Sequence, residues 1–228
     1  MDILEVQAPT GDELAGLRAR YMEAQLVGDA ARALRLLLDD GVARGVAVPL
    51  LQRKVVREAQ REIGRLWQEN RISVAQEHMA TAVSKAALSY LYEAAARAPS
   101  NGKRVLLSCV EGELHDFPAR LVADDLDLAG FELRYLGANV STDSLIESVI
   151  DDRPDLVALS ATMFFNLPAL QCALRRLRER VGPALPIMIG GAACSGAGMS
   201  ARDLDANATA AETAEIISTA KRLLGLSS

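Results

Sequence analysis

The sequence of 228 residues has few aromatic residues, few cysteines and only two histidines. Aromatic residues make up 4% of the chain and hydrophobic residues 50%, so a sizeable core has to be packed mainly from Leu, Val, Ile and Ala. The three cysteines, Cys109, Cys172 and Cys194, are an odd number and lack the spacing of metal ligands. We therefore expect Cys109 and Cys172 to be small core residues.

The sequence also lacks a long apolar run and an excess of basic residues. No apolar run reaches the roughly 18 residues of a membrane-spanning helix, and the first residues lack the basic and apolar segments of a secretion signal. The formal net charge of −5 and the pI of about 5.2 disfavour a nucleic-acid-binding face, which needs clustered Lys and Arg. We expect a soluble, cytoplasmic protein that binds neither nucleic acid nor membranes directly.

Residues 11 to about 98 carry apolar side chains at spacings of three and four, which predicts amphipathic helices. Asp29 and Ser73 are typical N-caps, and Pro49 is typical of a first helical turn. These signals predict helices over 12–27, from 29 to Gly41 or Gly45, from about 49 past 66, and from 73 past 90. Four such helices with short connections predict an antiparallel bundle, which we assign to residues 1–100.

After a linker at 98–102, short apolar runs alternate with helical stretches. The runs predict strands at 105–109, 133–136, 156–159 and 187–189, with helices at 117–129, 142–150 and 167–180. Such alternation is typical of a parallel sheet with right-handed crossovers. We therefore predict an α/β protein in which the four-helix bundle precedes a Rossmann-like (flavodoxin-like) parallel-sheet domain, residues 101–228. A fifth strand is expected within 201–208, and a capping box at Thr209–Glu212 is expected to open a final helix to Leu224.

Three loops would follow the carboxyl ends of these strands, where ligands bind in sheets of this type. They are residues 111–118, 160–166 and 190–198. The last loop consists of small residues, which would allow a bulky ligand to approach its backbone closely. Alternatively, a glycine-rich segment of this kind merely connects two elements.

Both histidines stand beside an acidic residue. His115 lies in Glu113-Leu114-His115-Asp116, after the first predicted strand, and His78 follows Glu77. Neutral imidazole is the commonest protein ligand for a metal, and a neighbouring carboxylate fixes its tautomer and raises its basicity. We therefore predict that His115 binds a metal. The alternatives are a surface histidine in a polar loop and, for His78, a helix residue paired with Glu77.

A helical bundle, a parallel-sheet domain and an acid-x-His loop after the first strand together resemble a cobalamin-binding module. The resemblance extends from about residue 12 to residue 224. It implies that His115 replaces the cofactor's own benzimidazole as lower ligand of cobalt, with Glu113 as the carboxylate behind it. It further implies cofactor contacts for Asp116, Ser160, Thr162, Gly190 and Gly191, the two glycines lying beside the displaced nucleotide tail.

The chain departs from the motif of that family at three positions. Glu113 replaces the usual Asp, and Ala208 stands where a terminal Asp is common. Pro118 stands where the final Gly of the motif is expected, which excludes a glycine-only backbone conformation there.

Trp67, followed nine residues later by Glu77-His78, is similar to the cap of CarH-type light sensors. In that family the Trp and the Glu contact the upper axial group, an adenosyl moiety. Four residues, Val74, Glu77, His78 and Thr81, are spaced to share one helix face. We include the first three of them with Trp67 among the cofactor-binding residues. Gln68 stands where those sensors place a further His.

The resemblance therefore implies a cobalamin-dependent photoreceptor that binds adenosylcobalamin base-off. We expect a standalone form without a DNA-binding domain, similar to photocobilins, which also bind a bilin such as biliverdin. Such a protein would be a sensor rather than an enzyme, a homo-oligomer such as a dimer, and would signal to an unknown downstream protein.

Two other functions remain open. The first is a methyl-corrinoid carrier that serves separate methyltransferases and uses the same His115. The second is a Rossmann-like binder of another small molecule, for which the two histidines would have no role. A separate alternative for Trp67 is that it is an ordinary packing residue.

Overall fold

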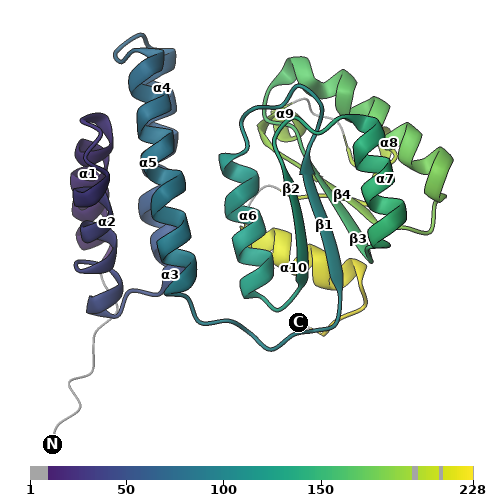
Figure 1. Ribbon diagram of the computed structural model, residues 1–228, viewed down its shortest axis with the longest axis horizontal. Coiled ribbons are helices and arrows are strands. Elements are labelled where there is room, and N and C mark those ends of the chain that lie inside the picture. Colours follow the sequence, from purple (N-terminus) through teal and green to yellow (C-terminus); the bar gives the residue numbers. More distant parts are fainter. Residues whose placement is uncertain (1–9, 197–199, 211–212, 228) are drawn as a thin grey trace, which may run out of the picture. The chain divides into compact units, whose positions relative to one another are not determined.

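A computed structural model describes residues 10–196, 200–210 and 213–227 of the chain. The chain forms two compact units, Met1–Ala96 and Arg97–Ser228, which we call the helical unit and the sheet unit (Figure 1). The boundary expected from the sequence, 100/101, lies slightly further along the chain. Each unit is described by itself.

The helical unit is built from four long helical segments and short turns. Its elements are α1 (Gly11–Leu26), α2 (Ala30–Leu38), a 3-10 turn (Val42–Arg44), α3 (Val48–Leu51), a π-helical turn (Gln52–Val56), α4 (Arg57–Gln68) and α5 (Val74–Glu93). Because α3, the π-helical turn and α4 follow one another without a break, they form one of the four predicted helices. Helix α1 packs against α2, α4 and α5, so the predicted bundle is confirmed.

Side-chain caps fix the starts of α2 and α5, the two helices for which the sequence predicts an N-cap of this kind. The Asp29 carboxylate accepts a hydrogen bond from the Arg32 amide at 2.9 Å, at the start of α2. Ser73 and Gln76 form a reciprocal capping box at the start of α5. Both predicted N-caps are thus confirmed, and each satisfies a backbone donor that the first helical turn leaves unpaired.

The sheet unit contains five parallel strands in the order β2-β1-β3-β4-β5. The strands are β1 (Arg104–Cys109), β2 (Glu132–Gly137), β3 (Leu156–Ser160), β4 (Ile187–Gly190) and β5 (Ala208–Thr209). The helices are α6 (Phe117–Leu128), α7 (Thr142–Asp152), α8 (Leu167–Val181), the short α9 (Ala192–Gly196) and α10 (Thr213–Leu223). This strand order is that of a flavodoxin-like sheet, as predicted, and places the chain reversal between β1 and β3.

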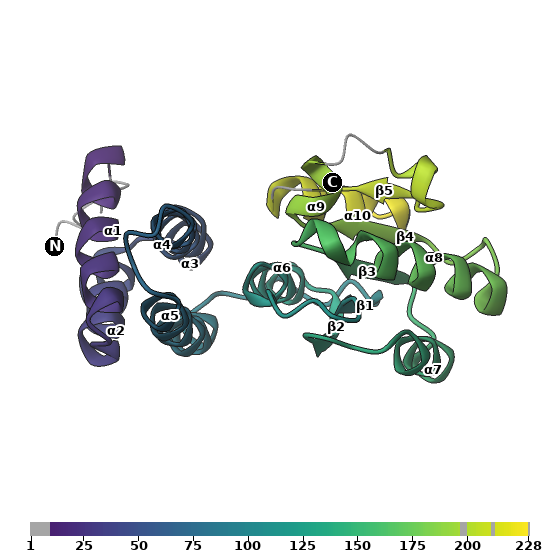
Figure 2. The same ribbon diagram turned by 90° about the horizontal axis from the view of Figure 1, so that it is seen from above.

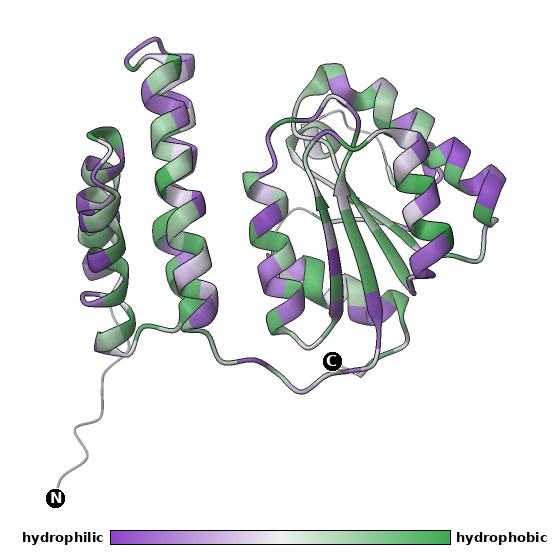
Figure 3. Cartoon of the chain, in the orientation of Figure 1, coloured by the Kyte–Doolittle hydropathy of each residue, from purple (hydrophilic) through white to green (hydrophobic). Residues whose placement is uncertain are grey.

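Both faces of the sheet are covered, so its central strands are apolar along their length (Figure 3). Val105 and Leu107 of β1 belong to a buried cluster with side chains of α6 and α10. Leu106 points to the other face and belongs to a cluster with side chains of α7 and α8. Figure 2 shows these helices around the sheet. Among the described residues, no helix is long and apolar enough to span a membrane.

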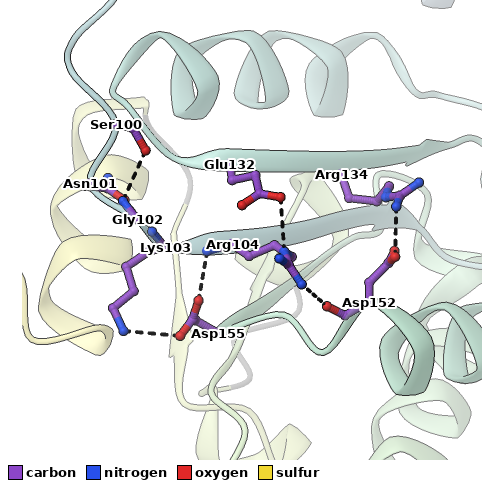
Figure 4. A network of polar contacts seen from close by, with 9 residues as sticks. All are labelled: Ser100, Asn101, Gly102, Lys103, Arg104, Glu132, Arg134, Asp152 and Asp155. Carbon is purple, nitrogen blue, oxygen red and sulfur yellow. Dashed lines mark hydrogen bonds and ion pairs between the residues drawn. The ribbon is translucent and has the colours of Figure 1, made fainter.

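Ion pairs and hydrogen bonds surround the start of β1 (Figure 4). The Asp155 carboxylate accepts from the Arg104 amide at 2.9 Å and from Lys103 Nζ at 3.2 Å. The Arg104 guanidinium donates to Glu132 at 3.2 Å and to the carbonyl of Asp152. These contacts tie the segment before β1 to β2 and to the end of α7. They lie at the amino ends of the strands, opposite the loops in which ligands are expected.

Four details of the sequence prediction need correction. Thr209 does not cap the final helix, because it belongs to β5 and the next amide, that of Ala210, donates to the Ile189 carbonyl at 3.1 Å. The rest of the predicted box, 211–212, lies outside the described residues. The fifth strand, expected within 201–208, falls only at the end of that range. Residues 192–196 of the predicted 190–198 loop form a helix, and Cys172 is only half buried.

Candidate functional site

The first group of predicted site residues lies in the loops that follow β1 and β3 in the sheet unit. Glu113 is fully buried, whereas the His115 side chain is 48% exposed. Glu113 Oε1 accepts hydrogen bonds from the amide and from Nδ1 of His115, both at 2.9 Å. The longer side chain of Glu113 therefore still reaches the imidazole, although the resembling family usually has Asp there.

The second oxygen of Glu113 binds the loop after β3. Oε2 accepts from the Thr162 amide at 2.8 Å, the Met163 amide at 2.9 Å and Asn166 Nδ2 at 2.8 Å. The side-chain amide of Asn166 is a buried donor at the start of α8. One buried carboxylate thus joins the two loops through five donors.

These hydrogen bonds determine the protonation states of the pair. Burial raises the pKa of Glu113, but the hydrogen bonds from Met163, Asn166, His115 and Thr162 outweigh it and leave the pKa below its usual range. The carboxylate is therefore ionised at neutral pH and only accepts, so Nδ1 of His115 carries the proton. The lone pair of His115 is then on Nε2, in the half-exposed ring.

The loop after β2 is connected to the same centre by backbone and side-chain contacts. Asn139 donates its amide to the Glu113 carbonyl at 2.9 Å and accepts from the Gly112 amide at 2.8 Å. Glu111 accepts from the Thr142 amide at 3.2 Å. These contacts and the role of Asn166 were not predicted from the sequence. Local signals exist: Asn139 adopts a positive φ of 52°, which Asn tolerates, and Asn166 precedes a Pro-containing helix start.

Ser160 and Thr162 lie at and just beyond the end of β3. Ser160 is buried, and its carbonyl accepts from the Val110 amide at 3.2 Å. Thr162 Oγ1 is buried and has no hydrogen-bond partner among the described residues. A buried hydroxyl without a partner is costly, so this atom is available to a polar group of a ligand.

Asp116 and Pro118 lie where the loop after β1 enters α6. Asp116 is the residue before the helix, and its carbonyl accepts from the Tyr135 hydroxyl at 3.3 Å. Pro118 is in the first turn of α6, where its fixed φ and missing donor are tolerated. The departure from the family's glycine is therefore accommodated by the helix start.

The second group of predicted residues lies at one end of the helical unit, where α4 ends and α5 begins. Trp67 is 38% exposed, Val74 51% and the His78 side chain 74%. His78 Nε2 is 3.6 Å from Glu77 Oε2, and Glu77 Oε1 accepts from the Thr81 hydroxyl at 2.8 Å. Glu77 thus contacts both His78 and Thr81, and Trp67 lies at the same end of the unit outside the bundle core.

Comparison with known proteins shows the family of the chain. Residues 103–196 and 17–92 each match a family model described as a B12 binding domain. Dimethylamine corrinoid protein 3 of Methanosarcina mazei is 33% identical over 116 residues, which are 50% of this chain and 68% of that protein. The chain belongs to the B12-binding proteins.

Two further proteins that are similar to this B12-binding protein have names that describe different functions, a transcriptional repressor and a corrinoid protein. The HTH-type transcriptional repressor CarH of Myxococcus xanthus is 30% identical over 132 residues, 58% of this chain. The chain spans less than half of that repressor, 44% of its length. The structure of the Methanosarcina barkeri monomethylamine corrinoid protein superposes with a TM-score of 0.78 at 22% identity, covering 92% of this chain and 99% of that one. It has the same fold.

The donor set of this B12-binding protein fits a corrinoid. His115 offers a single nitrogen, and the described residues contain no group of three or more His, Cys, Asp or Glu side chains that could hold a metal ion. One imidazole suits a metal whose remaining ligands come from a macrocycle. The exposed side chains of Leu114, Phe164 and Phe165 lie in the two loops that Glu113 joins and add apolar surface.

Gly190 and Gly191 form the end of β4 and the turn into α9. An added Cβ on Gly190 would lie 3.0 Å from the Ala210 carbonyl oxygen. Gly191 has a φ of +100°, and an added Cβ there would lie 2.2 Å from the Ala161 carbonyl oxygen. Position 191 therefore has to be glycine and the space at Gly190 is tight, and the bare backbone of the segment runs beside the loop after β3.

Replacing Gly191 by alanine is expected to lower the free energy of unfolding by about 3 kcal/mol. The positive φ of the residue and the close approach of the new Cβ to the Ala161 carbonyl oxygen both destabilise the folded protein. Gly182→Ala is the matched control, because Gly182 has a φ of +79° but nothing within 4 Å of the added Cβ. With a ψ of −179°, Gly182 lies in a backbone region that is essentially restricted to glycine, so we expect about 2 kcal/mol there. Urea denaturation measures both; equal losses would show that the approach of Ala161 carries no cost.

Proposed function

We propose that this protein is a cobalamin-dependent light sensor that binds adenosylcobalamin base-off, with His115 Nε2 as lower ligand of cobalt. The support is the protonated Nδ1 held by Glu113, which leaves Nε2 as the donor atom. When bound, adenosylcobalamin supplies absorption of visible light and a light-sensitive bond between cobalt and its upper group. The role of the chain is to hold, orient and respond to that cofactor.

In the sheet unit, we assign the remaining contacts to the nucleotide tail. Gly190 and Gly191 would lie beside the tail, and Ser160 along it. The partnerless hydroxyl of Thr162 is suited to a hydrogen bond with a polar group of the cofactor. Asp116 completes the predicted loop at the start of α6.

In the helical unit, we assign Trp67, Val74, Glu77 and His78 to the upper group. The observation that carries the light-sensor proposal is the exposure of Trp67, the only tryptophan, at the same end of the unit as Glu77 and His78. An amphipathic helix normally buries such a large ring against its neighbours, so an exposed one is available to a ligand. Residues 1–100 then act as cap and 101–228 as cobalamin-binding domain.

The output of such a sensor would be a change in the cap or in the oligomeric state, with a homodimer as the form to test, read by a downstream protein. A bilin such as biliverdin is a second chromophore to be tested by adding it to the cobalamin complex. Co-purification and a separate absorption band would support it.

A second candidate function is a methyl-corrinoid carrier. The similarity to dimethylamine corrinoid protein 3 favours it. This function would use the same lower ligand and would load the upper face with a methyl group. Uptake of a methyl group from a methyl donor and its methyltransferase, after reductive activation, would support the carrier over the sensor.

The deciding experiment is illumination of the reconstituted protein. We expect the dark adenosylcobalamin complex to change its absorption spectrum and its elution volume in size-exclusion chromatography after green light. Trp67→Ala should alter both responses, whereas Tyr90→Ala, at an exposed aromatic residue near the other end of α5, should leave them as in wild type. An unchanged spectrum and an unchanged elution volume in the wild type would contradict the sensor.

A further inference from the structure

The helical unit contains a group of hydrogen-bonded polar side chains inside its apolar core. Tyr21, Gln25 and Ser84 are fully buried. The Tyr21 and Ser84 hydroxyls are 3.1 Å apart, and Gln25 Nε2 donates to Ser84 Oγ at 2.7 Å. A buried polar group is costly unless it is hydrogen-bonded, and the members of a paired network hold one another in fixed orientations.

The orientation of each group in this cluster follows from a backbone carbonyl. The oxygen of Ala80 only accepts, so the Gln25 atom 3.1 Å away is the amide nitrogen. The same nitrogen is 3.2 Å from a side-chain atom of Gln60, which must therefore be the oxygen, Oε1. Ser84 donates to that oxygen at 3.1 Å, which leaves the Tyr21 hydroxyl as donor to Ser84. The Gln60 amide is thus held in one orientation.

From Gln60 the hydrogen bonds continue to Glu77. Gln60 Nε2 donates to Thr81 Oγ1, so the Thr81 hydroxyl has to direct its own hydrogen elsewhere. It donates to Glu77 Oε1 at 2.8 Å. A chain of aligned donors therefore runs from the buried core to one oxygen of a carboxylate whose side chain is 23% exposed.

This arrangement leaves the other oxygen of Glu77 for a ligand. Oε2 is paired, within the part of the chain that the structure describes, with the exposed His78 ring, whose Nε2 is 3.6 Å away and thus beyond hydrogen-bond distance. We infer that Gln60 and Thr81 are positioning residues that hold Glu77 so that Oε2 accepts from hydroxyl groups of the upper group. The inference rests on the proposed function. It makes the cap selective for an upper group that carries hydroxyl donors, as a nucleoside ribose does, over a methyl group.

The test compares two cobalamins and two variants in the dark. Thr81→Val keeps the shape of the side chain and removes the hydroxyl, and Thr81→Ser restores it. We expect Thr81→Val to weaken binding of adenosylcobalamin by about tenfold, as for loss of a hydrogen bond to a charged group. Binding of methylcobalamin should stay at the wild-type value, and Thr81→Ser should restore the preference. Gln60→Met should act in the same direction.

If Thr81→Val lowers the affinity for both cobalamins equally, Thr81 has a merely structural role and the inference is overturned. An unchanged affinity for adenosylcobalamin, or a failure of Thr81→Ser to restore binding, would also overturn it. A wild-type protein whose spectrum ignores light, with the preference intact, would overturn light sensing alone. A wild-type protein that takes up neither cobalamin would overturn both. In that case a double-mutant cycle of Thr81→Val and Glu77→Gln in the unfolding of the free protein still measures whether the two side chains are coupled.

Discussion

Replacing His115 by alanine is expected to weaken cobalamin binding by more than about 100-fold, because loss of a residue behind a metal ligand already costs 10–100-fold. The remaining complex should show the spectrum of cobalt without a protein nitrogen in the lower position. The physical reason is the single donor atom: Glu113 holds Nδ1, and Nε2 is the only atom of the pair that carries a free lone pair. Absorbance titration with adenosylcobalamin and with methylcobalamin measures both effects.

Two controls separate ligation from folding. Asp151→Ala removes an exposed side chain near the end of α7 and should leave binding and spectrum as in wild type. Acid should act on the wild type as the substitution does, since a protonated imidazole cannot coordinate, and should have little further effect on the variant. Wild-type affinity and an unchanged spectrum in His115→Ala would refute the assignment of the lower ligand.

The elements of this fold were predictable because their signals are local. Ser73 and Asp29 cap the helices that they were expected to cap, since an N-cap acts within three residues. The strands read as short apolar runs because both faces of the sheet are covered, as the two clusters on either side of β1 show. The parallel arrangement of the strands followed from the general rule for alternating strands and helices.

The errors lie where a distant contact overrides the local signal. Thr209 has the sequence pattern of a helix cap, but its segment pairs with β4 through residues that are about twenty positions away. The π-helical turn at Gln52–Val56 has no signal in the periodicity. Small residues at 192–196 read as a loop because their helical start depends on the turn at Gly191.

The candidate site was predictable only in part for the same reason. His115 and Glu113 are two residues apart, so their pairing is visible in the sequence. The partners of the second Glu113 oxygen are 49 to 53 residues further along the chain and become neighbours only when β1 and β3 pair. The contact between Gln60 and Thr81 likewise depends on the packing of α4 against α5.

Replacing Glu113 by glutamine is expected to lower the free energy of unfolding by about 2–4 kcal/mol at neutral pH, as for unpaired buried donors. Glutamine has one oxygen, whereas both oxygens of Glu113 accept, two donors on one side and three on the other. In either orientation of the glutamine side chain, its NH2 group therefore faces N–H donors instead of an acceptor. Cobalamin affinity should fall by about 10–100-fold, because the His115 ring loses the group that fixes its tautomer. Glu147→Gln, at an exposed residue of α7, is the matched control.

The pH dependence of this effect has a definite sign. The folded protein lowers the pKa of Glu113 below its ordinary value of 4.5, despite the opposing effect of burial, because donors from two loops stabilise the carboxylate. Its contribution to stability is therefore fully present above about pH 4.5 and is lost as the pH falls through the folded pKa. Glutamine has no such ionisation, so the difference in unfolding free energy between wild type and Glu113→Gln should shrink below pH 4.5. Urea denaturation at a series of pH values measures it, and a difference that stays constant down to pH 3 would contradict an ionised carboxylate between the two loops.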